Sequence, residues 1–258
     1  MRLMKRILSA AAVLALSASL LVGCSSGTAS SVPVSASSAA ESTVSSVEET
    51  ASSAVDENEA AAAQLLNDIT GSYQELWPVI LADEYKQTWL DDCTALVGED
   101  NAEAAFEKLS SMVTGDVYGE DAVKAYANGG GAYFCGFTNS LAILTFDGET
   151  STISGTDKDG NVLFSHTYHY IGMEPVRGLY EFQSDDADSG EFTYFFLAPD
   201  TSAETYHIEF RYGSDAEALS QYDTGEYAYW LASGISTDCD QTMIDNCIEL
   251  FCTENLAG

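Results

Sequence analysis

Apolar residues recur every three or four positions in the first half of the chain, a spacing that predicts helices. Two segments show it, 85–96 and 102–112, and the Ala-rich segment 60–69 also predicts a short helix. Gly98 ends the pattern at 85–96, and Asp100 or Asn101 could cap the helix at 102–112. A further segment with the same spacing, 243–251, predicts a helix near the end of the chain.

Beyond Gly129 the period of apolar residues shortens to two, which predicts β-strands. Turn sequences at 157–160 and 184–190 indicate hairpins. Consecutive hairpins of this length predict an antiparallel meander that closes, or nearly closes, into a barrel. The expected strands are 133–137, 141–146, 152–156, 161–170, 178–183, 191–197 and 206–212.

The first residues have the pattern of an export signal. A short basic start precedes an apolar stretch at 7–21, which is too short and too rich in Ala and Ser to predict a membrane span. The sequence Leu21-Val22-Gly23-Cys24 that follows resembles a bacterial lipobox. We therefore expect residues 1–23 to be a lipoprotein signal peptide, and acyl chains on Cys24 to anchor the protein at the cell surface or in the periplasm. An ordinary secretory signal followed by an incidental cysteine is the alternative.

Residues 24–59 are rich in Ser and Ala, and no aromatic residue occurs before Tyr73. Such a segment buries too little apolar surface to offset its ordering entropy, so we expect a flexible tether. One domain is then expected over 60–258.

The net charge of the chain limits the classes of function that it can have. The chain has 9 Lys and Arg against 41 Asp and Glu, a formal net charge of −32. This excess argues against nucleic acid and against polybasic lipid adhesion, and it attracts cations. The sequence contains no recognisable nucleophile, phosphate-loop or dinucleotide motif, so we expect a binding protein and not an enzyme.

His207 and Glu209 are the most suggestive pair of side chains. Alternation along a strand places both on one face, with Ile208 and Phe210 on the other. An imidazole nitrogen and a carboxylate at this spacing can share a cation. The alternative is a histidine packed in the interior and hydrogen-bonded to Glu209.

Residues 191–230 resemble the C-terminal part of the ZinT (YodA) family of metal-binding proteins. The resemblance rests on three segments: 195–199 (FFLAP), 207–215 (HIEFRYGSD) and 225–230 (GEYAYW). It implies a lipocalin-like (calycin) antiparallel β-barrel with flanking helices. It also implies capture of a divalent cation, zinc above all, and delivery to an ABC-type metal importer.

The chain departs from the family at the metal site. In the family, three histidines inside the barrel hold zinc, whereas the corresponding positions here are Phe195, His207 and Glu209. A further donor is needed, and His169 is the best candidate because its strand belongs to the same sheet. Weaker candidates are Glu181, Asp200 and Glu204. The alternative is a calycin with a degenerate site that binds a small apolar ligand or a partner protein.

Five cysteines follow Cys24, an odd number that leaves at least one thiol unpaired. Export would permit disulfides. Cys247 and Cys252 lie too far apart along one helix to form a bond with each other. The sequence therefore predicts small buried cysteines, with room for one long-range pair.

Overall fold

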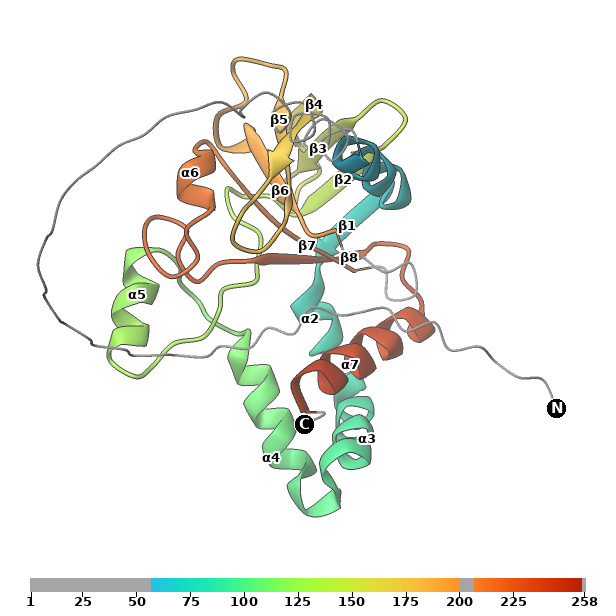
Figure 1. Cartoon of the computed structure of the whole chain (residues 1–258). Coiled ribbons are helices and arrows are strands. Elements are labelled where there is room, and N and C mark those ends of the chain that lie inside the picture. Colours follow the sequence, from blue (N-terminus) through green and yellow to red (C-terminus); the bar gives the residue numbers. More distant parts are fainter. Residues whose placement is uncertain (1–56, 200–206, 257–258) are drawn as a thin grey trace, which may run out of the picture. The chain divides into compact units, whose positions relative to one another are not determined.

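The computed structural model describes residues 57–199 and 207–256, which belong to one compact unit, Val55–Gly258. They fold into a closed antiparallel barrel, in which each strand pairs with the next along the chain and β8 pairs with β1 (Figure 1). The predicted mainly β, lipocalin-like barrel with flanking helices is confirmed. The strands are β1 Gly71–Glu75, β2 Ile143–Asp147, β3 Thr152–Thr156, β4 Val162–Met173, β5 Tyr180–Ser184, β6 Tyr194–Leu197, β7 His207–Gly213 and β8 Ala232–Ser236.

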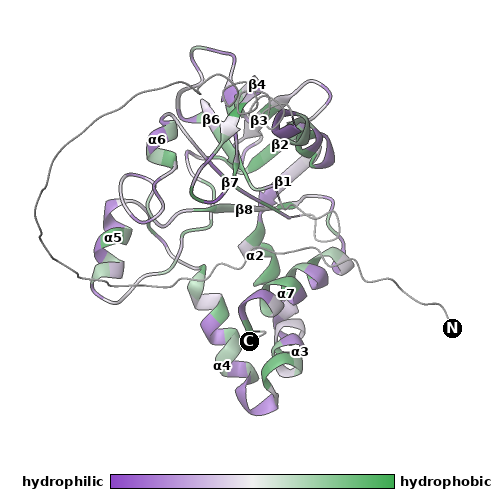
Figure 2. Cartoon of the chain, in the orientation of Figure 1, coloured by the Kyte–Doolittle hydropathy of each residue, from purple (hydrophilic) through white to green (hydrophobic). Residues whose placement is uncertain are grey.

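Helices lie before, between and after the strands. They are 57–68, α2 Leu76–Ile80, α3 Lys86–Val97, α4 Glu99–Met112, α5 Glu120–Ala127, α6 Ala216–Leu219 and α7 Gln241–Leu256, with 3-10 turns η1 Asp83–Tyr85 and η2 Gly190–Phe192. Figure 2 shows hydrophilic and hydrophobic residues alternating along α4 and α5, as amphipathic helices require. Among the described residues no helix is long and apolar enough to cross a membrane.

Some expected boundaries differ from the structure. Residues 57–59, which we expected in the tether, are already helical. The expected cap of α4 at Asp100 or Asn101 is wrong. Gly98, with a φ of 85°, reverses the chain directly between α3 and α4, so α4 begins at Glu99. The signal peptide, Cys24 and most of the tether lie outside the described residues.

The segment 133–137 is not a strand. It makes isolated bridges at Phe134, to Thr114 and to Trp230, and runs beside the chain that leads into β8. Instead, β1 and β8 complete the barrel, with Tyr73 opposite Ser236. Neither strand shows the alternation of large apolar and polar residues on which the sequence prediction relied.

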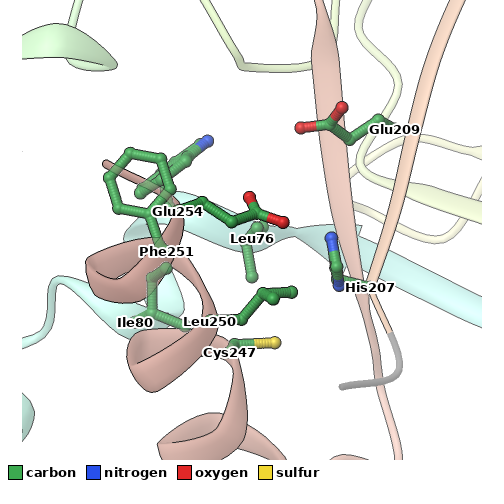
Figure 3. A pocket seen from close by; sticks show the side chains of 9 residues that line it. Leu76, Ile80, His207, Glu209, Cys247, Leu250, Phe251 and Glu254 are labelled. Atoms are coloured by element: carbon green, nitrogen blue, oxygen red, sulfur yellow. The ribbon is translucent and has the colours of Figure 1, made fainter. Parts of the chain in front are cut away.

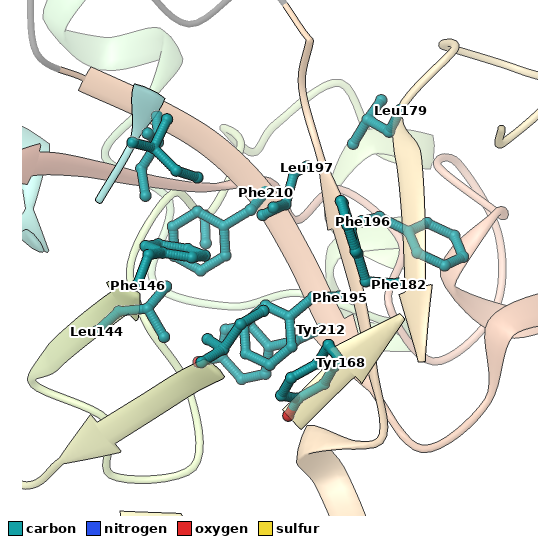
Figure 4. Close-up of a cluster of buried hydrophobic side chains, with 14 of the residues drawn as sticks. Leu144, Phe146, Tyr168, Leu179, Phe182, Phe195, Phe196, Leu197, Phe210 and Tyr212 are labelled. Atoms are coloured by element: carbon teal, nitrogen blue, oxygen red, sulfur yellow. The ribbon is translucent and has the colours of Figure 1, made fainter. Parts of the chain in front are cut away.

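Two apolar clusters hold the fold together. The first fills the barrel with aromatic rings, among them Phe195, Phe210 and Tyr212, each fully buried (Figure 4). The second lies where α2, α3, α4 and α7 pack on one another and on β8. The second cluster fixes α7 against the barrel, and α7 supplies one wall of the site described next.

Candidate metal-binding pocket

Strand β7 presents two different faces. Ile208, Phe210 and Tyr212 point into the barrel and belong to its aromatic cluster. Because side chains alternate along a strand, His207 and Glu209 point out of the barrel. The two side chains share a face, as predicted, but that face is not the lumen that the family resemblance implied. The large aromatic neighbours decide the orientation, because their burial stabilises the barrel more than burial of an imidazole and a carboxylate could.

Outside the barrel, His207 and Glu209 line a small pocket between β7, α2 and α7 (Figure 3). Its cavity volume is about 40 Å³, enough for an ion and one or two waters. The other lining residues are Leu76, Trp77, Ile80, Cys247, Leu250, Phe251 and Glu254. The lining therefore combines apolar side chains with ionisable groups.

Helix α7 contributes two side chains with donor atoms to this pocket. Cys247 and Glu254 are seven residues apart, two turns of helix, so they lie on the same side of α7. In Figure 3 the Cys247 sulfur and the Glu254 carboxylate both reach toward His207. Nitrogen, oxygen and sulfur donors thus surround one hollow. As their side chains stand, no three His, Cys, Asp or Glu residues in the described part of the chain form a metal-holding group.

Negative charge extends behind the pocket. Burial, and after it the charge of Glu209, raises the pKa of the Cys135 thiol to about 12. Cys135 is bound to β8 through its carbonyl oxygen, which accepts the Ser233 backbone N–H at 3.0 Å. The shift indicates that the Cys135 thiol is buried close enough to Glu209 for the carboxylate charge to act on it.

The structure does not bring His169 to this pocket. His169 lies on β4, separated from β7 by β5 and β6, and its Nδ1 is 2.6 Å from Asp185 Oδ1. The nearby His166 makes a similar contact with Asp186 at 2.8 Å. These two pairs connect β4 to the acidic turn that follows β5.

The weaker donor candidates are not placed at the pocket either. Glu181 lies on β5 and does not line it, and burial followed by the charge of Glu174 raises its pKa. Asp200 and Glu204 lie outside the described residues. The sequence reasoning missed Cys247 and Glu254. The only sequence feature that bears on them is the helical pattern at 243–251, which places Cys247 on the apolar face of the predicted helix.

The position that holds a histidine in the family is part of the packed lumen. Phe195 is fully buried, and its ring centroid lies 5.3 Å from Tyr212, 5.4 Å from Tyr168 and 5.9 Å from Phe164. Such packing makes the centre of the barrel a hydrophobic core. An apolar ligand could enter there only by displacing these rings.

Comparison with known proteins finds similarity among solved structures. No protein-family profile and no curated protein matches the chain. The Zn(II)-bound ZinT-like domain of AdcA from Streptococcus pneumoniae is 15% identical, with a TM-score of 0.45, over 71% of this chain and 89% of that domain. Zn(II)-bound AdcA itself is 14% identical, with a TM-score of 0.42, over 72% of this chain. The chain spans about a third (35%) of the length of AdcA.

Proposed function

We propose that this protein is a membrane-anchored, extracytoplasmic binding protein that captures a divalent cation, zinc above all, for delivery to an ABC-type importer. One observation carries the proposal: the imidazole of His207, the carboxylates of Glu209 and Glu254 and the thiol of Cys247 line the same pocket. Zinc prefers this mixture of nitrogen, oxygen and sulfur donors. Magnesium and calcium prefer oxygen donors alone, so the imidazole and thiol favour zinc.

Capture requires a small rearrangement. Glu209 and Glu254 have flexible side chains that can turn toward a cation between β7 and α7, whereas His207 is attached to the rigid barrel. His207 would supply a neutral nitrogen and the glutamates would supply the charge that balances the ion. Cys247 would have to lose its proton on binding, as thiol ligands do.

The rest of the chain suits this role. A formal charge of −32 raises the cation concentration around the molecule. Acylation at Cys24 and the Ser/Ala-rich tether would keep the barrel close to a membrane importer while leaving it free to move. Cys24 and most of the tether lie outside the described residues, so both features are part of the proposal.

Calorimetric titration of zinc into chelator-stripped protein tests the proposal. At 0.15 M NaCl with excess Mg²⁺ present, we expect one saturable zinc site, because weak surface binding is then screened and occupied. The variant His207→Ala should bind zinc more than about tenfold more weakly, since it loses a protein ligand. His169→Ala is the matched control and should bind like the unmodified protein. Zinc affinity should also fall as the pH is lowered toward about 6, because a protonated imidazole cannot coordinate a metal.

Two results would reject the pocket. Absence of saturable heat would favour the degenerate calycin that binds an apolar ligand or a partner protein. Loss of zinc binding in His169→Ala, with His207→Ala unaffected, would move the site to β4 and the turn after β5.

A further inference from the structure

Two buried cysteines meet where the last helix packs against the helical cluster. Cys93 lies on α3 and Cys252 on α7, and their Sγ atoms are 3.9 Å apart. Both side chains are fully buried. The residues are 159 positions apart in the sequence, so the contact exists only because the helices pack together.

We propose that Cys93 and Cys252 form a disulfide that fastens α7 to α3. A disulfide needs the sulfurs to approach from 3.9 Å to about 2.0 Å, which rotation of the two side chains can supply where the helices already touch. The contact is specific to this pair among the five thiols that the structure describes. Cys247, on the same helix, lines the pocket instead.

The bond forms by thiol–disulfide exchange with a protein or small-molecule disulfide as oxidant. One cysteine thiolate attacks the oxidant and releases its first sulfur as a thiol, which leaves a mixed disulfide. The second cysteine thiolate then attacks that mixed disulfide, forms the Cys93–Cys252 bond and releases the second thiol. Two electrons pass from the cysteine pair to the oxidant, and the two cysteine protons end on the released thiols.

Burial determines when this exchange can happen. It raises the pKa of both thiols, so neither is a ready nucleophile once α7 has docked. The bond therefore forms while the chain folds, and the packed helices then shield it from reductants. Its persistence in the cell rests on the export proposed above, whereas its formation in purified protein does not.

Refolding in a glutathione redox buffer tests the pairing directly. The reduced protein is unfolded in urea, refolded with reduced and oxidised glutathione, alkylated and cleaved after glutamate. Cys93 and Cys252 then fall in separate peptides, 85–99 and 250–254. We expect mass spectrometry to show these two peptides joined, with Cys135, Cys239 and Cys247 alkylated. The oxidised protein should melt about 5–15 °C above its reduced form, because the bond closes a long loop.

Matched variants separate the pairing from general thiol chemistry. Cys239→Ser, at a cysteine two residues before α7 begins, should keep the linked peptides and the melting difference. Cys93→Ala should lose both, and oxidised and reduced samples of that variant should melt together. Joining of any other cysteines, or full alkylation of all five after refolding, would overturn the proposal. Neither result bears on zinc binding, which the titration above measures independently.

Discussion

Tyr212 shows what a single hydroxyl contributes inside the barrel. The ring is fully buried, and its hydroxyl accepts the Thr138 backbone N–H at 2.6 Å and the Thr138 side-chain hydroxyl at 3.0 Å. It donates to the Thr138 carbonyl, also at 3.0 Å. Burial raises the pKa of this phenol, which therefore stays protonated and able to donate. One residue of β7 thus holds the loop before β2 in place.

We expect Tyr212→Phe to destabilise the protein by about 1–3 kcal/mol, because it leaves the Thr138 backbone groups without their partner in a buried region. Urea unfolding measures the change. Tyr194→Phe is the control: among the described residues the Tyr194 hydroxyl makes no hydrogen bond, so its removal should change stability by less than about 0.5 kcal/mol. Equal effects of the two variants would contradict this account of Tyr212.

At the same scale, the sequence predicted that His207 and Glu209 share a face of their strand, but not which face. Alternation fixes only relative positions, whereas the choice between lumen and exterior depends on what the other strands bring. Here the rings of Phe195 and Phe164 fill the lumen, so Phe210 and Tyr212 turn inward. The sequence of β7 alone therefore cannot show which of its faces turns into the lumen.

Among the elements, α3 and α7 pack together despite an unfavourable charge at their contact. Asp92 on α3 has one carboxylate oxygen that is buried without a hydrogen-bond partner among the described residues. Partial burial, followed by the nearby charges of Glu249 and Asp245 on α7, raises its pKa above 3.8. The folded protein therefore binds the Asp92 proton more tightly than the unfolded chain does. The stability that comes from protonated Asp92 is therefore greatest at low pH, and it is lost as the pH rises through the pKa of Asp92 in the folded protein.

Asp92→Asn should therefore stabilise the protein at pH 7 by up to about 1 kcal/mol, the size expected for partly exposed charges. The gain should shrink as the pH falls through the raised pKa of Asp92, because protonation then removes the buried charge from the native carboxylate as well. Urea unfolding of both proteins at pH 7 and pH 4 measures it. Asp68→Asn serves as the control, since Asp68 is exposed, accepts a hydrogen bond from Gln64 at 2.7 Å and is not among the charges that raise the pKa of Asp92. A loss of stability in Asp92→Asn at pH 7 would show that the carboxylate is favourable.

The sequence identified most elements but not those that close the barrel. β3 was predicted with its observed ends, because Asp-Lys-Asp-Gly at 157–160 marks the turn and alternation marks the strand. β1 and β8 contain small and polar residues and were missed. Their pairing is decided by close approach: a Cβ at Gly234 would lie 3.2 Å from Ile208 and 3.3 Å from Tyr73. Close contacts of this kind exist only in the folded barrel, so the sequence of β1 or β8 alone does not reveal them.

For the whole molecule, the pocket joins three segments that are distant in sequence: α2, the start of β7 and the end of α7. The sequence could supply His207 and Glu209, which are neighbours on one strand. It could not supply Cys247 and Glu254, because their place depends on how α7 docks against α2 and α3. Donor sets of this kind become visible only in the folded chain.

Charge acts at this same scale but does not define a site. The excess of 41 acidic over 9 basic residues attracts every cation, and salt screens that attraction over about 8 Å at physiological ionic strength. Specific capture must therefore come from ligands that hold the ion at short range. The central claim is accordingly about a location: zinc between β7 and α7.

Anomalous diffraction at the zinc edge, from crystals grown with zinc, tests that location most directly. The account predicts one strong anomalous peak outside the barrel, within about 2.0–2.3 Å of a His207 ring nitrogen and of at least two donors among Glu209, Glu254 and Cys247. A peak at His166 or His169 with their aspartate partners, or zinc scattered over surface carboxylates with none at His207, would contradict it.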